Sequence, residues 1–210
     1  MFSGIVETQA RVVRSERDRG LVRIAVERPA EFDDLGLGDS VCTNGVCLTI
    51  ETLSDDAITF ALGAETLKIT GWDESQLLGA TVNLERSMKM GDRNHGHVVT
   101  GHVDATGRVV SIEDLGGSVQ VNVQAPESVL RYVWRKGSWA INGVSLTVNS
   151  VEGDVVSVCL IPETLKRTNL GAIKAGDQVN LEVDPMARGV AQLVEQYLQA
   201  RKVSQEQEKE

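Results

Sequence analysis

The sequence predicts an all-β protein made of two similar small domains, followed by one C-terminal α-helix. Three observations predict this fold class. A long segment of the chain is repeated, apolar residues within each copy mostly alternate with a period of two, and this period changes to that of a helix after residue 185.

The repeat is visible at several places in one register. The segment SVCTNGVCLTI at 40–50 returns 98 residues later as SWAINGVSLTV, with six of eleven positions identical. The motif VNLE occurs at both 82–85 and 179–182. A period this long exceeds that of solenoid repeats, so each copy should form a domain. Two similar domains offer two similar pockets, which suggests two similar ligands brought together.

Within each copy, short apolar stretches predict strands. Residues 21–26, 119–123 and 155–160 alternate as half-buried strands do. The turn pairs Asn44-Gly45 and Asn142-Gly143 predict hairpins, because both residue types tolerate positive φ. Strands this short and this closely spaced favour a sandwich or a closed barrel over a βαβ fold.

Helical segments are few. We expect one short helix over 126–133 and single turns over 66–69 and 164–168. After Asp184-Pro185, the apolar residues follow the i, i+3, i+4 rule of an amphipathic helix. This helix lies outside the repeat, so it either docks on its own chain or associates with the same helix of other subunits. The expected domains are 1–97, 98–185, the helix 186–203 and a polar, frayed tail 204–210.

Composition narrows the function classes. The net charge is −9, with 21 basic and 30 acidic residues, so nucleic acid and anionic membranes are poor candidate partners. No apolar run approaches the length of a membrane span, and the N-terminus lacks the features of a signal peptide. Three cysteines, none in a CxxC pair, fit a reducing compartment. We therefore expect a cytoplasmic protein.

All three histidines fall within eight residues, at positions 95, 97 and 102. A His-x-His pair on a strand points both rings to one face, so a metal site on His95, His97 and His102 is one alternative. In the other, His95 belongs to the polar loop that begins at Gly91 and never shares a face with His97. His97 and His102 then suit acid–base or hydrogen-bonding chemistry near neutral pH. We expect no metal.

The two cysteines of the first copy, Cys42 and Cys47, are five residues apart. On a straight strand they would face opposite sides, an expectation that the Asn44-Gly45 turn between them weakens. They are therefore poor partners for the histidines in a metal site.

The two copies agree at some polar positions and differ at others. The shared residues could bind the common part of two ligands, or could be mere turn and strand formers. They are the pairs Asn44/Asn142, Thr49/Thr147 and Thr66/Thr164. The differing residues could concentrate catalysis in one copy. They are the pairs Cys47/Ser145, Gly38/Lys136 and Ile5/His102.

Five motifs in order give the chain a resemblance. They are MFSGIVE at 1–7, NGVCLT at 44–49, GHVVTGHVD at 96–104, KGS at 136–138 and NGVSLT at 142–147. Together they resemble the riboflavin synthase family from Met1 to about Arg201, the duplication and the C-terminal helix included. Each motif alone would be weak, but the five in this order are highly specific.

The resemblance implies a fold, an assembly and a reaction. The fold is two six-stranded Greek-key β-barrels, and the assembly is a homotrimer held largely by the C-terminal helices, with active sites between unlike barrels of adjacent subunits. Two molecules of 6,7-dimethyl-8-ribityllumazine would dismutate by four-carbon transfer to riboflavin and 5-amino-6-ribitylamino-pyrimidinedione. This is the last step of riboflavin biosynthesis. No metal or organic cofactor is implied, and association with lumazine synthase is a possible further partnership.

Residue roles follow from the resemblance and the repeat. His102 is expected to be the base, with His97 orienting it or sharing the proton. Cys47 and Ser145 would deliver or hydrogen-bond the nucleophile, which can equally be water, and Lys136 would stabilise negative charge on the ring. The substrate-binding residues expected are Phe2, Ser3, Gly4, Val6, Cys47, Leu48, Thr49, Gly63, Ala64, Glu65, Thr66, Gly101, His102, Val103, Lys136, Asn142, Ser145, Leu146, Thr147, Ile161, Pro162, Glu163 and Thr164.

The chain departs from the family pattern at three places. His95 stands where the family usually has glycine, Asn142 where it usually has aspartate, and Ser3 where it usually has threonine. An amide can only hydrogen-bond where a carboxylate could act as acid or base. If Asn142 abolished catalysis, the chain could instead resemble the antenna proteins that hold one lumazine or flavin chromophore and do no chemistry.

Overall fold

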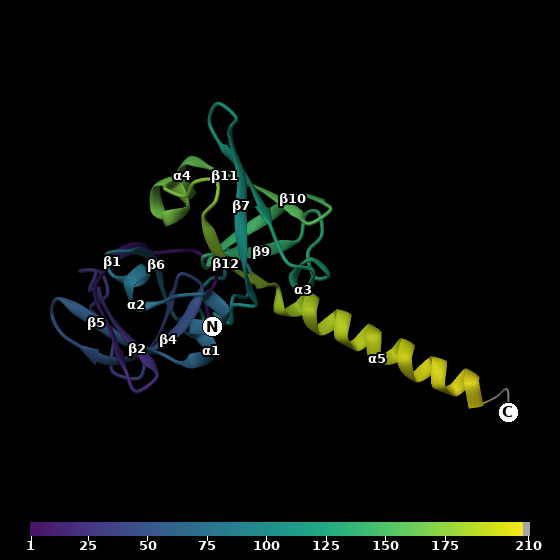
Figure 1. Ribbon diagram of the computed structural model, residues 1–210, viewed down its shortest axis with the longest axis horizontal. Coiled ribbons are helices and arrows are strands. Elements are labelled where there is room, and N and C mark those ends of the chain that lie inside the picture. The colour runs from purple at the N-terminus through teal and green to yellow at the C-terminus, as the bar shows by residue number, and fades with distance from the viewer. Residues whose placement is uncertain (208–210) are drawn as a thin grey trace.

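The computed structural model of the protein describes residues 1–207 and shows two closed β-barrels and one long helix (Figure 1). The first barrel contains β1 (Thr8–Asp18), β2 (Leu21–Glu27), β3 (Ser40–Thr43), β4 (Val46–Leu53), β5 (Ala57–Leu62) and β6 (Thr81–Arg86). The second contains β7 (Ala105–Asp114), β8 (Val119–Gln124), β9 (Ser138–Ile141), β10 (Val144–Glu152), β11 (Val155–Leu160) and β12 (Gln178–Val183).

The two barrels have the same topology. Around the first, the neighbours are β1-β2-β5-β4-β3-β6, and the second repeats this cyclic order as β7-β8-β11-β10-β9-β12, with every pair antiparallel. Closure leaves no strand edge unpaired in either barrel, which removes the aggregation hazard of open edges. The all-β prediction of two six-stranded barrels is confirmed.

Each barrel encloses its own apolar core. Along β4, Val46, Leu48 and Ile50 are buried while Thr49 faces outward, as the period of two predicts. The equivalent alternation on β10 buries the counterparts of these residues. The strands expected from residues 21–26, 119–123 and 155–160 are β2, β8 and β11.

Both Asn-Gly pairs form tight hairpin turns, as predicted. Asn44 and Asn142 each have φ 48°, and the glycines that follow also have positive φ, the signature of a type I′ turn. The first turn places Cys42 directly opposite Cys47 on β3 and β4. The straight-strand geometry therefore does not apply to this pair, because the chain reverses between the two cysteines, as the Asn44-Gly45 turn indicated.

Short helices occupy equivalent places in the two lobes. The segments expected at 66–69 and 164–168 are α1 (Ala64–Thr70) and α4 (Pro162–Arg167). The helix expected over 126–133 is shorter, as α3 (Glu127–Leu130). The remaining short helices are α2 (Glu74–Leu77) and the 3₁₀ turn η1 (Asn169–Gly171).

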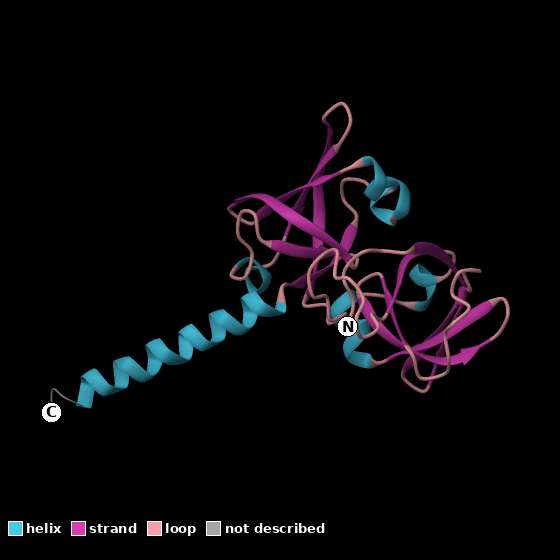
Figure 2. Cartoon of the chain, turned by 180° about the vertical axis from the view of Figure 1, so that it is seen from behind, coloured by secondary structure: helices cyan, strands magenta, loops and turns pink. Residues whose placement is uncertain are grey.

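The C-terminal helix α5 (Pro185–Gln207) leaves the second barrel and projects away from both (Figures 1 and 2). It includes residues 204–207, which were expected to fray, and residues 208–210 of that predicted tail lie outside the described part of the chain. Its apolar residues are exposed; Leu193 and Tyr197 are 67% and 65% accessible. Within residues 1–207, no helix combines the length and apolar character needed to cross a membrane.

An amide network joins the barrels at their hairpin turns. The side-chain Nδ2 of Asn83 donates to the backbone carbonyl of Asn142 at 2.9 Å. In the same way, the side-chain Nδ2 of Asn180 donates to the backbone carbonyl of Asn44 at 2.9 Å. These reciprocal bonds relate the lobes by a local twofold. Asn169 breaks the symmetry, because its carboxamide bonds Asn83, Asn142, Asn44 and Thr81, whereas the matching residue in the first lobe is Gly71.

Candidate active site

The barrels exchange two matched segments, residues 2–7 and 99–104. The segments pair with each other, with Phe2 N to Val99 O at 2.8 Å and Val99 N to Phe2 O at 3.0 Å. Each then reaches the opposite barrel. The N–H of Ser145 donates to Gly4 O at 2.8 Å, and the N–H of Cys47 donates to Gly101 O at 2.9 Å. Each lobe therefore contributes a backbone segment to the site of the other barrel.

The close approach explains the two glycines of these segments. A Cβ on Gly4 would lie 2.6 Å from Cβ of Ser145, and one on Gly101 would lie 2.5 Å from Cβ of Cys47. Both glycines also have φ in the left-handed region, at +73° and +79°. A side chain at Gly4 would push its segment away from β10, which carries Ser145. A side chain at Gly101 would likewise push its segment away from β4, which carries Cys47.

Two buried glutamates hold the crossing segments. Glu85 accepts bonds from Ser3 N at 2.7 Å, Ser3 Oγ at 2.8 Å and Gly4 N at 3.0 Å. Glu182 accepts the same three bonds from Thr100 and Gly101. Burial raises the pKa of Glu85 to about 7 although these hydrogen bonds lower it, and burial likewise raises the pKa of Glu182. Both clamps therefore titrate above the usual range of a glutamate.

A cavity of about 240 Å³ opens on the first barrel beside Cys47. Three of its lining residues, Gly101, His102 and Val103, belong to the crossing segment of the second lobe. The full lining is Val46, Cys47, Glu65, Thr66, Ile69, Thr70, Gly101, His102 and Val103. The structure thus brings together six of the residues expected to bind substrate, with His102 and Cys47 facing one space.

In the second lobe, Ser145 has a histidine partner. His97 Nδ1 lies 2.7 Å from Ser145 Oγ, and the residue is 8% exposed. Burial lowers the pKa of His97, and the nearby Asp184 opposes this shift, so the imidazole is neutral near pH 7. Its Nε2 has no hydrogen-bond partner among the described residues. A neutral ring with one free nitrogen can relay a proton to or from the Ser145 hydroxyl.

The matched positions therefore carry different groups. By the repeat, Ser145 corresponds to Cys47, and Ile5 of the crossing segment corresponds to His102. Ile5 is 42% exposed and has no acid–base chemistry. His97 and His102 were expected to work together, whereas the structure places His97 on Ser145 and His102 in the cavity with Cys47.

Other expected binding residues lie around these two places. Gly63, Ala64, Ile161, Pro162, Glu163 and Thr164 begin α1 and α4, and most of them are exposed. Thr49 and Thr147 are exposed on β4 and β10, outside the cavity lining. Leu48, Leu146 and Val6 belong to the barrel cores, and Val6 of the first lobe packs into the core of the second. Phe2 is buried with Cys42, Val99 and Ala140.

Two further expected residues, Asn142 and Lys136, lie outside the cavity lining. Asn142 is 6% exposed; its Oδ1 accepts the N–H of Asn180 at 2.8 Å and its Nδ2 reaches Asn169 Oδ1 at 3.3 Å. An aspartate here would place a carboxylate against the Asn169 oxygen, which explains the amide. Lys136 is exposed and has φ 69°, at the position of Gly38 in the first lobe.

The three histidines do not gather into a metal site. His95 is exposed in the loop before the crossing segment, and not on a strand with His97. Within residues 1–207, no group of three or more His, Cys, Asp or Glu side chains could hold a metal ion. The loop alternative for His95 is the one that the structure shows.

Sequence reasoning missed several residues of the site. Val46, Ile69 and Thr70 line the cavity, and Glu85 and Glu182 hold the crossing segments. The repeated motif VNLE ends in these two glutamates, so their agreement between the copies was a usable signal. The crossing itself left no signal in the sequence.

Comparison with known proteins places the chain in a family. The sequence model of the lumazine binding domain family matches this chain twice, at residues 3–87 and at residues 100–184. The crystal structure of LumP complexed with riboflavin superimposes with a TM-score of 0.80 at 23% identity, covering 87% of this chain and 99% of that one. The fold and the two matches define a protein built from two lumazine-binding domains.

Relatives that align over nearly their whole length identify the family within this class. Riboflavin synthase of Mycobacterium tuberculosis is 41% identical over 92% of this chain and 98% of that protein. Riboflavin synthase of Escherichia coli is 38% identical over 96% of this chain and 95% of that protein. The chain belongs to the riboflavin synthase family.

Proposed function

We propose that this chain catalyses the dismutation of two 6,7-dimethyl-8-ribityllumazine molecules to riboflavin and 5-amino-6-ribitylamino-pyrimidinedione. The observation that carries the proposal is the unequal pair of sites. One backbone frame occurs twice, with Cys47 facing His102 in the first lobe and Ser145 bonded to His97 in the second. Two copies of one substrate need two similar pockets, but donor and acceptor roles need different groups.

The reaction needs a base and a nucleophile. A proton leaves the C7 methyl group of one lumazine, and the resulting carbanion is stabilised by the ring; a nucleophile adds to C7 of the other. We assign proton removal to His102, which faces the cavity beside Cys47. We assign addition at C7 to the second lobe, where neutral His97 accepts the proton of Ser145 Oγ or of a water that this hydroxyl holds.

The remaining polar residues bind rather than react. Glu65 and Thr66 of α1, and Glu163 and Thr164 of α4, are the matched residues that would hold the ribityl hydroxyl groups. Lys136 would reach negative charge on the ring oxygens of a ligand in the second lobe. On this assignment residues 1–97 and 98–185 are the two lumazine-binding domains.

The assembly that we propose is a homotrimer associated through residues 186–203 of α5. The cavity of about 240 Å³ is smaller than typical sites for ligands of this size, so a barrel of another subunit would complete the enclosure. The apolar face of α5 includes Val190, Leu193 and Tyr197, all more than half exposed, which a second copy would cover. Association with lumazine synthase stays a prediction.

The assembly can be tested on the two faces of α5. Leu193→Glu combined with Tyr197→Glu should give smaller species in light scattering, with strongly reduced turnover. Gln192→Glu combined with Gln199→Glu, on the opposite face, is the matched control and should leave the mass unchanged. A monomeric apolar-face variant with full turnover would contradict the shared site.

The reaction itself is tested by incubating the protein with 6,7-dimethyl-8-ribityllumazine and following riboflavin absorbance. An enzyme converts two substrate molecules into one riboflavin and one pyrimidinedione. An antenna-type protein would bind the lumazine and shift its fluorescence without forming riboflavin, and that outcome would refute the proposal.

A further inference from the structure

The crossing segments end in matched acids, Glu7 and Asp104. Each accepts a backbone bond from the end of the last strand of its barrel. The N–H of Arg86 donates to Glu7 Oε1 at 2.7 Å, and the N–H of Val183 donates to Asp104 Oδ2 at 2.9 Å. The backbone frame is thus the same in both lobes.

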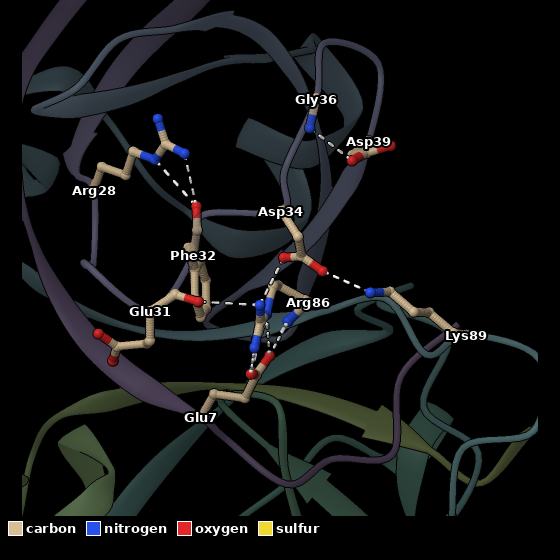
Figure 3. A network of polar contacts seen from close by, with 9 residues as sticks. All are labelled: Glu7, Arg28, Glu31, Phe32, Asp34, Gly36, Asp39, Arg86 and Lys89. Carbon is tan, nitrogen blue, oxygen red and sulfur yellow. Dashed lines mark hydrogen bonds and ion pairs between the residues drawn. The ribbon is translucent and has the colours of Figure 1, made fainter.

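The arginine that neutralises each acid comes from a different element. In the first lobe, Arg86 itself folds onto Glu7, with Nη2 to Oε2 at 2.5 Å, and also pairs with Asp34 (Figure 3). The second lobe has Val183 at this position, and the guanidinium is supplied by α5. Arg188 Nη2 lies 2.5 and 2.6 Å from the two oxygens of Asp104.

This ion pair is partly protected from water. The side chain of Asp104 is 21% exposed and that of Arg188 is 39% exposed, so the pair is screened less than one on the open surface. Burial raises the pKa of Asp104, and the Val183 N–H and the Arg188 charge both lower it. Removing Arg188 would leave a half-buried carboxylate held by one backbone bond.

Asp104 lies two residues after His102, on the same short segment. That segment is held at its start by Glu182 and at its end by Asp104. Among residues 1–207, the His102 side chain makes no hydrogen bond that would orient it, so the backbone of the segment sets its place in the cavity.

Helix α5 makes other contacts at its start and near its middle. Asp184 Oδ1 caps the helix by accepting the N–H of Met186 at 2.8 Å. Farther along, Glu195 pairs with Arg131, which directly follows α3. Of these attachments, the one through Arg188 is the contact that reaches the crossing segment.

We propose that Arg188 is a positioning residue, which holds Asp104 and thereby fixes His102 in the cavity of the first barrel. This rests on the proposed role of His102. It makes the first turn of α5 part of the site's support, so the helix that presents the apolar face also sets the place of the base.

The test compares Arg188→Ala with Arg188→Lys and with Arg131→Ala, which removes a second ion pair of α5, the one with Glu195, without touching the segment. Amide hydrogen exchange is measured over residues 99–104, with residues 2–7 as internal reference. We expect Arg188→Ala to speed exchange in 99–104 only and to lower kcat roughly 10- to 100-fold, with a shifted pH profile. Arg188→Lys should restore part of both, and Arg131→Ala should change neither.

The outcomes separate this proposal from the proposed function. If the wild-type protein formed no riboflavin, the exchange experiment would still decide whether Arg188 orders the segment. Unchanged exchange in Arg188→Ala would overturn the positioning role, even if turnover fell. Equal losses in Arg188→Ala and Arg131→Ala would assign the effect to helix attachment in general and would overturn it too.

Discussion

The two lobes share a backbone and differ in their reactive groups. Their barrels have the same strand order, the asparagines of their hairpin turns have the same φ, and their glutamate clamps make the same three bonds. At the site, however, Cys47 and His102 of one lobe's pocket correspond to Ser145 and Ile5 in the other. The duplication preserved the backbone frame of the two sites and changed the side chains that can react there.

The same division applies to the joint between the lobes. The hydrogen bonds that the side-chain amides of Asn83 and Asn180 donate are reciprocal. Asn169 has no counterpart, because Gly71 stands at the matching position and lacks a side chain. The support of the crossing segments is also unequal, since Arg86 comes from a strand and Arg188 from a helix. Asymmetry is therefore introduced by single side chains on a nearly symmetric frame.

The largest effect should follow from removing the histidine of the first cavity. His102→Gln should lower turnover by ~10²–10⁴, the range of general acid–base catalysis, while the lumazine still binds. Steady-state kinetics and fluorescence titration would measure the two quantities. Near-normal turnover would remove His102 from the mechanism, and a greater loss in His97→Gln would move the base to the second lobe.

A second variant gives the matched positions 47 and 145 the same side chain. Cys47→Ser gives the first lobe the side chain type of the second and should lower turnover less than His102→Gln if the Cys47 thiol only hydrogen-bonds. The same kinetic assay measures it. A loss as large as that of His102→Gln would argue for a thiolate nucleophile at Cys47.

The clamp of the first lobe should make stability depend on pH. Because the folded-state pKa of Glu85 is raised from 4.5 to about 7, the folded state binds more protons than the unfolded state in that window. Stability therefore falls as pH rises from 4.5 to 7, by on the order of 2–3 kcal/mol. Urea unfolding at pH 5 and pH 8 should show that Glu85→Gln removes this loss.

The exposed Glu27 at the end of β2 provides the matched control. Glu27→Gln should leave the pH dependence of the free energy of unfolding as in the wild type. If Glu85→Gln and the wild type lost equal stability between the two pH values, the clamp would not be the titrating group.

The side chain of Asn169, which has no counterpart in the first lobe, should stabilise the contact between the two barrels. Asn169→Ala strands the side-chain N–H of Asn142 and removes one partner each from Asn83 and Asn44. The expected loss is roughly 1–3 kcal/mol in the free energy of unfolding. Asn149→Ala, at a position outside the network, is the control and should change little. An equal effect of both substitutions would show that Asn169 contributes nothing special.

The smallest effect on stability is expected at Lys136, which occupies the position that Gly38 holds in the first lobe. Lys136 adopts φ 69°, which costs a non-glycine residue about 1 kcal/mol, but glycine also gains freedom in the unfolded chain. Lys136→Gly should therefore change the free energy of unfolding by less than about 1 kcal/mol, while weakening ligand binding if the ammonium group reaches the ring. Thermal melting and fluorescence titration would separate the two; unchanged affinity would make Lys136 a surface charge.

Much of this protein was predictable because its signals are local. Alternation along β2 and β11 depends on each residue's own side chain, and Asn-Gly turns depend on two neighbouring backbones. The repeat showed that two domains exist, and the periodicity after Pro185 showed the helix. The resemblance named Cys47 and His102 as site residues, but it paired His102 with His97, and only the structure places His102 with Cys47 in one cavity.

The tertiary structure alone decided which lobe completes which pocket. Gly4 and Gly101 cross to opposite barrels because their backbones bond Ser145 and Cys47, partners separated by many residues and not marked by any local pattern. The same holds for Asn169 and Arg188, whose side chains act on residues of other elements. A duplicated sequence determines two equal frames, but contacts between distant segments exist only after the chain has folded, and these contacts make the two sites unlike.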